Sequence, residues 1–225
     1  MTHFTEPGAV LRAPGRARGL PLLSYRQGGK RLSDLVLSIL LAPLVAPLVA
    51  LFWLAAKADG GPGFFAQDRV GLDGQRFRCW KIRSMHPDAE RRLAELCATD
   101  PHAARDWDEN MKLARDPRVT RLGRVLRATG LDELPQLWCV LRGDMSLVGP
   151  RPITAPELAR YGSARGAYLS LRPGITGPWQ VSGRNRVAYG TRVELDARYA
   201  QDLSLARDLV ILWRTIGTVL RRTGC

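Results

Sequence analysis

The sequence predicts a mainly helical α+β protein: a re-entrant membrane helix hairpin, then one compact domain with a small β-hairpin and interfacial amphipathic helices. Two observations support this. Leu35 to Ala56 contains no charged residue, and short segments of helical or strand periodicity follow it. The 225 residues are 45% hydrophobic and 24% charged, which is typical of a globular protein. We therefore expect a basic flexible tail (1–29), a membrane segment (30–58) and a compact domain (59–225).

The charge balance indicates anionic partners. Lys and Arg total 34 against 21 Asp and Glu, a net charge of +13 at pH 7. Nucleic acid, an anionic membrane surface and phosphorylated substrates all fit this charge. The 4 Cys are scattered and only 3 His occur, which argues against a zinc site, a disulfide framework and a His-based triad. Any chemistry must then rest on carboxylates, hydroxyls and basic side chains.

The uncharged run from Leu35 to Ala56 is long enough to cross a membrane. As a helix it would extend roughly 33 Å, against about 30 Å for the hydrocarbon core of a bilayer. Pro43 and Pro47 stand at its middle, where each removes a backbone donor and kinks the helix. Both flanks are basic, and basic residues collect on the cytoplasmic side of membrane helices. We expect a helix that breaks at the prolines and returns to the same face; a true span and a buried core helix are the alternatives.

Periodicity and turn residues predict the elements of the compact domain in chain order. Asp73-Gly74 favours a hairpin turn between two short strands. The Pro-, Gly- and Arg-rich stretch 149–190 predicts irregular structure. The final helix is amphipathic, which suits either the membrane interface or the protein's own core. The predicted helices cover 88–113 with a break near Pro101, 122–127, 134–141 with Asp132 and Glu133 at its start, 192–202, and 203–220.

Asp132 and Glu133 form an acidic pair at a predicted helix start. Taken alone, such a pair is usually a helix cap. Its surroundings favour a further function, because arginines recur in Pro- and Gly-rich motifs: GDMSLVGPRP from Gly143, RPGITG from Arg172 and SGRN from Ser182. A guanidinium held in a rigid loop suits bidentate recognition of phosphate.

These motifs resemble those of the bacterial sugar transferases, specifically the small monotopic polyprenyl-phosphate phosphoglycosyl transferases. The resemblance runs from about Lys30 to Arg222. It departs from the family at the helix break, which commonly carries Ser-Pro but here reads Ala42-Pro43. Besides the arginine motifs, it rests on Lys30-Arg31 with Asp34, FAQDRVG from Phe65, KIRSM from Lys81 and LDELPQL from Leu131.

The resemblance implies an enzyme of the bacterial inner membrane whose catalytic domain, residues 59–225, faces the cytoplasm. It implies transfer of a sugar 1-phosphate from a nucleotide diphosphate sugar, usually a UDP-sugar, to undecaprenyl phosphate, with Mg²⁺ as cofactor. By family analogy, Asp132 attacks the sugar-linked phosphate, releases UMP and carries the phosphosugar until the lipid phosphate takes it. Direct attack by the lipid phosphate, with the acids only holding Mg²⁺, is the alternative mechanism.

The family pattern also assigns roles to individual residues. Asp132 is the nucleophile and a Mg²⁺ ligand, and Glu133 supports the site. Lys81 could instead be a solvated surface lysine, and Asp208 an ordinary acid on a helix surface. The predicted substrate-binding residues are Lys81, Arg127, Arg151, Arg184, Asn185 and Asp208, with the phosphates assigned to the first three, the nucleotide to Arg184 and Asn185, and an active-site acid role to Asp208.

Two other classes of protein fit parts of the sequence. One is a non-catalytic membrane scaffold of the same fold, which the intact Asp132-Glu133 pair disfavours. The other is a basic, membrane-tethered nucleic-acid-binding protein, but no recognition motif is visible, so we expect no nucleic acid partner. Anionic membrane lipid is the expected partner of the basic tail. The sugar, the glycan pathway and the oligomeric state, a homodimer included, stay open.

Overall fold

A computed structural model describes residues 25–110, 113, 116–183 and 187–220. Most of the predicted basic tail, together with Arg184 and Asn185, lies outside the described residues. The mainly helical α+β class is confirmed, with two small sheets. The elements are η2 (Tyr25–Gly29), α1 (Lys30–Lys57), β1 (Phe64–Val70), η3 (Leu72–Gly74), β2 (Arg76–Ile82), α2 (Ala89–Thr99), α3 (Pro101–Asn110), α4 (Arg121–Thr129), η4 (Leu131–Glu133), α5 (Gln136–Arg142), β3 (Ser146–Val148), α6 (Ala155–Ala159), η5 (Gly162–Ala164), α7 (Arg165–Leu169), β4 (Gly174–Thr176), α8 (Tyr189–Gln201) and α9 (Leu205–Leu220).

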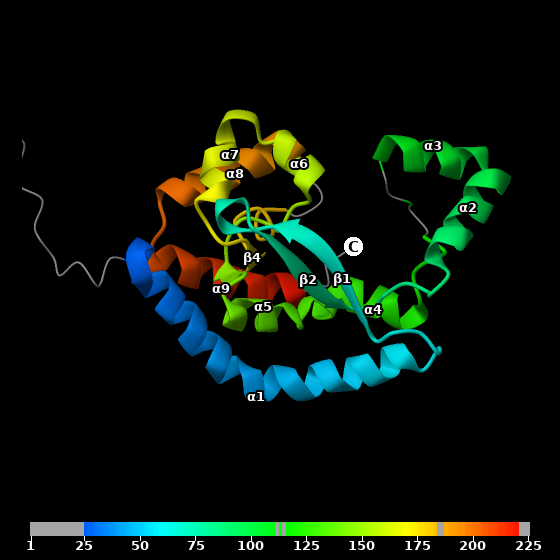
Figure 1. The fold of residues 1–225 in the computed structure, drawn as a ribbon, viewed down its shortest axis with the longest axis horizontal. Helices are drawn as coiled ribbons and strands as arrows, with labels where there is room; N and C mark the ends of the chain where they lie inside the picture. The colour runs from blue at the N-terminus through cyan, green and yellow to red at the C-terminus, as the bar shows by residue number, and fades with distance from the viewer. Residues whose placement is uncertain (1–24, 111–112, 114–115, 184–186, 221–225) are drawn as a thin grey trace, which may run out of the picture.

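The predicted membrane segment is one bent helix. α1 continues through Pro43 and Pro47, and Figure 1 shows that it bends near its middle, with the rest of the described chain on the inner side of the bend. The bend is where the prolines remove two backbone donors. The predicted hairpin is therefore not seen as two separate helices. The segment Tyr25–Lys57 is long and apolar enough to cross a membrane. Many of its large apolar side chains are exposed: Leu32, Val36, Ile39, Leu40, Leu41, Leu44, Leu51 and Leu54.

The N-terminal end of α1 is fixed to the compact domain by buried charges. Lys30 Nζ lies 2.7 Å from Asp208 Oδ2 on α9. One turn later, Asp34 accepts hydrogen bonds from Ser146 Oγ at 2.7 Å and from the backbone N of Leu147 at 3.1 Å, both on β3. A buried charge is stable only when it is paired or hydrogen-bonded. These contacts therefore fix the position of the first turns of α1 against α9 and β3.

The C-terminal end of α1 is fixed to the same domain. The buried guanidinium of Arg83, just after β2, pairs with Asp59 and donates to the backbone carbonyl of Ala56. This satisfies a carbonyl that the end of a helix leaves without a partner. The chain then turns at Gly63, where a Cβ would lie 2.3 Å from the ring of Trp53, so only glycine fits.

The predicted β-hairpin is confirmed. β1 and β2 pair antiparallel, with Phe64 opposite Ile82 and Val70 opposite Arg76. The turn lies at Asp73 and Gly74, which have φ of 54° and 80°. Both values lie in the left-handed region, which glycine and aspartate tolerate best.

The helices around the acidic pair differ from the prediction in one respect. α4 ends at Gly130, whose φ of 75° gives the left-handed C-cap. Asp132 and Glu133 then form their own 3-10 turn, η4, and α5 starts only at Gln136. Neither acid caps a helix with its side chain. The prediction that the pair begins α5 is therefore wrong, because Gly130 and Pro135 create a separate turn between the two helices.

The prediction of irregular structure over 149–190 is wrong in part. This stretch contains α6, η5, α7 and the strand β4, which pairs parallel with β3. α6 begins with a capping box between Thr154 and Glu157. The glycines serve close packing: a Cβ on Gly149 would lie 2.5 Å from the carbonyl oxygen of Arg172, and one on Gly174 would lie 2.1 Å from the N of Gly149.

The last two helices complete the domain. α8 starts earlier than predicted and buries Tyr199, while α9 follows the prediction closely and buries Asp208 and Ile211. The outer face of α9 is apolar and exposed, at Leu205, Leu209, Val210, Trp213 and Ile216. The predicted break at Pro101 is confirmed, since α3 starts there. α2 and α3 project away from the domain (Figure 1), and α2 has no buried residue.

Candidate active site

Asp132 is held in place by its neighbours in sequence. Leu131 packs against a buried cluster of Ala56, Ile82 and Leu126, which joins α1, β2 and α4. The tight 3-10 turn then carries Asp132 inward, where it is 7% exposed. Anchoring an apolar neighbour in this way fixes the direction of the carboxylate without using its oxygens.

Burial and nearby charges act in opposite directions on Asp132. Burial raises the pKa of the carboxyl above its ordinary value, and the negative charge of Glu133 adds to this, whereas the positive charges of Lys81 and Arg127 lower it. No other described residue donates a hydrogen bond to the side chain. A buried carboxylate without such donors is a stronger base and nucleophile than a solvated one, which suits covalent chemistry.

Two cations stand beside the acidic pair. Lys81, near the end of β2, places its Nζ 2.6 Å from Glu133 Oε1. Arg127 on α4 donates from Nε to Ser84 Oγ at 2.8 Å. This contact depends on Gly123, because a Cβ there would lie 1.9 Å from the carbonyl oxygen of Ser84 and push α4 away from the strand.

A small pocket lies next to the acidic pair and is lined in part by Glu133. Three cations contribute to it: Lys81, Arg69 at the end of β1, and Arg151 of the GPRP motif. Arg151 also lies over the buried ring of Trp179, 5.5 Å from the ring centroid, a distance at which a cation is attracted by the aromatic face. The pocket is therefore suited to an anion. Its lining consists of Arg69, Cys79, Lys81, Glu133, Gln136, Arg151, Pro152, Ile175 and Gln180.

The structure thus brings several predicted site residues together. Lys81, Arg127 and Glu133 all act on the charge of Asp132, and Arg151 shares the pocket with Lys81 and Glu133. Arg184 and Asn185 lie outside the described residues. Pro43 and Pro47 lie inside α1, at the bend described above.

Asp208 lies in a different cluster. Its described partners are Lys30, Tyr25 and Tyr199, at the N-terminal end of α1. None of them contributes to the pocket beside Asp132. The assignment of Asp208 to the active site therefore stays a prediction.

Three residues that line the pocket were not predicted as site residues: Arg69, Gln136 and Gln180. Arg69 had a signal, because it belongs to the FAQDRVG motif. Gln136 had one too, because it belongs to the LDELPQL motif. Gln180 had none, since a glutamine in a loop is an ordinary surface residue. Gln136 is nevertheless buried at 2% exposure, and Gln180 has a buried Oε1 without a hydrogen-bond donor among the described residues.

The described side chains can be compared with the ligands that the predicted Mg²⁺ would need. The described residues contain no group of three or more His, Cys, Asp or Glu side chains placed to hold a metal. They do contain the adjacent carboxylates of Asp132 and Glu133. Mg²⁺ typically binds through one or two carboxylates and completes its shell with water and substrate phosphate, so these residues fit a magnesium ion that arrives with a phosphate-bearing substrate.

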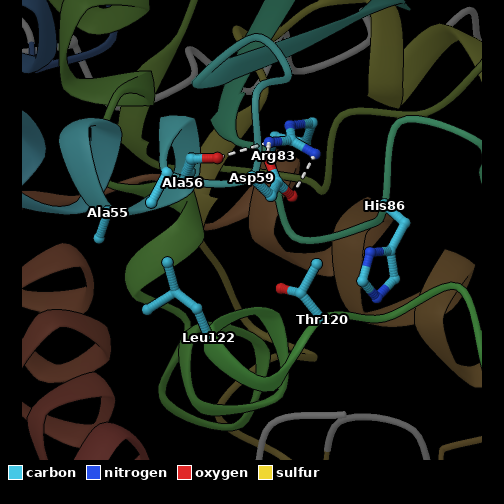
Figure 2. Close-up of a pocket in the computed structure, with 8 residues that line it drawn as sticks. Ala55, Ala56, Asp59, Arg83, His86, Thr120 and Leu122 are labelled. Atoms are coloured by element: carbon cyan, nitrogen blue, oxygen red, sulfur yellow. Dashed lines mark hydrogen bonds and ion pairs between the residues drawn. The ribbon is translucent and has the colours of Figure 1, made fainter.

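A second pocket, of about 280 Å³, lies at the C-terminal end of α1. Figure 2 shows Arg83 there, pointing to Asp59 and the carbonyl of Ala56, with Thr120 and Leu122 across from it and His86 to one side. The guanidinium of Arg83 also donates to the carbonyls of Pro62 and Met85. The charge in this pocket is therefore used to hold the end of α1.

Comparison with known proteins gives a consistent result. The family model described as bacterial sugar transferase matches residues 25–222. The undecaprenyl-phosphate galactose phosphotransferase of Salmonella typhimurium is 49% identical over 87% of this chain, and the UDP-galactose-lipid carrier transferase of Erwinia amylovora is 48% identical over the same share. The chain spans 41% of the length of each. The exopolysaccharide production protein ExoY of Sinorhizobium fredii is 46% identical, with 87% of both chains covered.

Proposed function

The chain belongs to the bacterial sugar transferase family, and we propose that it transfers a sugar 1-phosphate from a UDP-sugar to undecaprenyl phosphate. The main support is the buried, poorly hydrogen-bonded Asp132 beside a pocket with three cations. The relatives named for transfer of galactose phosphate to undecaprenyl phosphate and for exopolysaccharide production suggest the substrates and the role, the first membrane step of a surface glycan.

In the first half-reaction, a carboxylate oxygen of Asp132 attacks the sugar-linked phosphorus of the donor. A bond forms between that oxygen and the phosphorus, the bond to the bridging oxygen breaks, and UMP leaves with the electron pair. The raised pKa of Asp132 helps because it makes the ionised carboxylate a better nucleophile. Lys81, Arg127 and Arg151 would balance the charge of the diphosphate, the effect that supplies most of the rate in phosphoryl transfer.

In the second half-reaction, a phosphate oxygen of undecaprenyl phosphate attacks the same phosphorus. The acyl phosphate bond breaks, which restores the Asp132 carboxylate and yields undecaprenyl diphosphate sugar. No proton need be gained, because the attacking phosphate and the leaving carboxylate are both anions. Lys81 holds the Glu133 carboxylate in place through the 2.6 Å contact during both steps.

Asp132 and Glu133 would hold a Mg²⁺ ion together with oxygens of the donor diphosphate. When bound, the ion would neutralise phosphate charge and stabilise the leaving UMP. The charges of Lys81 and Arg127 lower the pKa of Asp132, and Lys81 also pairs with Glu133.

The re-entrant topology is part of this proposal. A 28-residue helix extends about 42 Å, yet both ends of α1 contact the same compact domain, at Asp208 and at Arg83. A straight span would carry one end across the bilayer and away from that domain. The bend at Pro43 and Pro47 instead supports both ends returning to the cytoplasmic face of the inner membrane, beside the lipid acceptor.

The reaction is tested with the full chain in detergent or nanodiscs, undecaprenyl phosphate and a panel of UDP-sugars. We expect UMP and a lipid-extractable sugar from at least one donor, and loss of both in Asp132→Asn. Asp68→Asn, which removes an exposed acid from β1, is the matched control and should retain activity. Normal activity of Asp132→Asn would contradict the covalent mechanism.

A single-turnover experiment separates the covalent mechanism from direct attack. With donor and Mg²⁺ but without lipid acceptor, the covalent mechanism gives about one UMP per active enzyme molecule, and the phosphosugar stays on the protein. Direct attack gives no UMP until undecaprenyl phosphate is added.

A further inference from the structure

Arg69 is fixed beside the GPRP loop by buried hydrogen bonds. The backbone N of Val70 donates to the carbonyl of Ile153 at 2.9 Å. Tyr168 then donates from Oη to the carbonyl of Val70 at 2.7 Å and accepts from the N of Ile153 at 3.2 Å. Because Tyr168 and Ile153 are almost fully buried, the end of β1 cannot move away from this loop without breaking the core. The position of Arg69 next to Arg151 is therefore built into the fold.

The positive charge of Arg69 is only partly balanced. Its side chain is 14% exposed, and its nearest carboxylate oxygen, Glu157 Oε2, is 3.5 Å away. That same oxygen already accepts from the N and the Oγ1 of Thr154, each at 2.9 Å. The other described acceptor is the uncharged Oε1 of Gln67, at 2.5 Å. A guanidinium has five N–H donors, so Arg69 retains donors for another acceptor.

The neighbouring cation has even less compensation. Among the described residues, Arg151 makes no ion pair, and its contact is with the ring of Trp179. Burial lowers the pKa of Arg69, and the positive charge of Arg151 is the next largest cause. Two like charges beside one half-closed pocket repel each other, and an anion bound between them would remove the repulsion.

We propose that Arg69, together with Arg151, binds the diphosphate of the nucleotide-sugar donor. This inference rests on the proposed function. It adds Arg69, which lines the pocket from the β-hairpin, to the residues of the site. Lys81 and Glu133 close the same pocket on the side of Asp132. The diphosphate would then lie between Arg69 and Arg151 on one side and the nucleophile on the other.

Binding of UDP tests this inference. The full chain in detergent is titrated with UDP in the presence of Mg²⁺ by calorimetry. Arg69→Gln should weaken UDP binding by roughly tenfold to a hundredfold, the range expected for loss of a charged hydrogen bond, while Arg69→Lys should recover part of the loss. Arg76→Gln, which removes an exposed arginine of the same hairpin, should bind UDP as the wild type does.

A merely structural role of Arg69 predicts a different result. If Arg69 served only to hold Glu157 and α6, then Glu157→Gln would weaken UDP binding as much as Arg69→Gln. We expect Glu157→Gln to leave UDP binding unchanged or to strengthen it, because it frees the guanidinium. Equal losses in the two variants, or wild-type UDP affinity in a folded Arg69→Gln, would overturn the inference.

The same experiments distinguish this inference from the proposed function. A wild-type chain that makes no lipid-linked product, but whose UDP binding depends on Arg69, would refute the transfer reaction and support the diphosphate site. A chain that makes product while Arg69→Gln binds UDP normally would leave the reaction standing and refute only the role of Arg69.

Discussion

Asp132 and Asp208 are both buried, at 7% and 4% exposure, but their surroundings differ sharply. Asp208 receives Lys30 at 2.7 Å, Tyr25 at 2.5 Å and Tyr199 at 2.6 Å. Asp132 receives no hydrogen bond from another described residue, and the cations near it act only through their charge. One carboxylate is enclosed by donors and the other is left open.

The difference indicates what each carboxylate does. A buried carboxylate whose oxygens are all occupied holds elements together, and here it joins α9, α8 and the start of α1. A buried carboxylate without donors lowers the stability of the fold, and proteins tolerate that mostly where chemistry requires it. Burial by itself therefore does not identify a catalytic acid.

The largest expected effect comes from breaking the enclosed cluster. Asp208→Asn leaves Lys30 buried without its nearest acid, so we expect a loss of about 3–5 kcal/mol of stability, measured by thermal or denaturant unfolding in detergent. Asp202→Asn removes an exposed acid that pairs with Arg207 and should cost at most about 1 kcal/mol. A folded Asp208→Asn with wild-type stability but no activity would instead assign Asp208 to the active site.

Asp196 extends the comparison to a third buried carboxylate. Burial raises its pKa to about 7, and Tyr161 is its only described donor, at 2.9 Å. The folded-state pKa is raised, so the stability from this group is complete below pH 4 and is lost as the pH rises through about 7. Asp196→Asn should be near neutral below pH 4 and should stabilise the fold by on the order of 4 kcal/mol at pH 9.

The control for Asp196 is Glu194→Gln, an exposed acid on the same helix. It should show no such dependence on pH. Equal unfolding curves of wild type and Asp196→Asn at pH 9 would show that the carboxyl is better solvated than its burial implies.

Asp132→Asn should change the stability of the fold in the opposite direction from Asp208→Asn. Burial raises the pKa of Asp132, so its ionised form destabilises the fold at neutral pH. Its removal should raise stability by about 1 kcal/mol while activity is lost, a trade-off common at active sites. A clear loss of stability would mean that Asp132 is a structural carboxylate like Asp208.

The smallest expected effect is a shift in pH dependence. Lys81 lowers the pKa of Asp132, so Lys81→Met should move the acidic limb of the activity profile to higher pH. Arg78→Met, on the same strand, is the control, since Arg78 is exposed and lies over Trp80, 5.3 Å from the ring centroid. An unmoved acidic limb in Lys81→Met would show that the acidic limb does not report Asp132.

Much of the fold followed from local sequence. The turn at Asp73-Gly74, the break at Pro101 and the helix end at Gly130 depend on backbone preferences that act within a few residues. The short strands β3 and β4 were not predictable in this way. They have three residues each, and the parallel pairing that defines them joins residues nearly 30 positions apart.

The candidate site was predictable to the extent that motifs carried it. Asp132, Glu133, Lys81 and Arg151 were recognised from short blocks, and the structure brings them to one place. Arg69 was not assigned, because its importance depends on the approach of β1 to Ile153. A sequence does not give the distance in space between two of its motifs.

The sequence by itself determined the composition of this protein: an apolar segment with two central prolines, an excess of basic residues, and an acidic pair among arginine-rich loops. Only the tertiary structure decided which buried carboxylate is enclosed by donors and which is left open. The physical reason is that charge, periodicity and turn preference are local properties of the chain. Burial and hydrogen-bond partners depend on segments such as α1, β3 and α9, which meet only when the chain has folded.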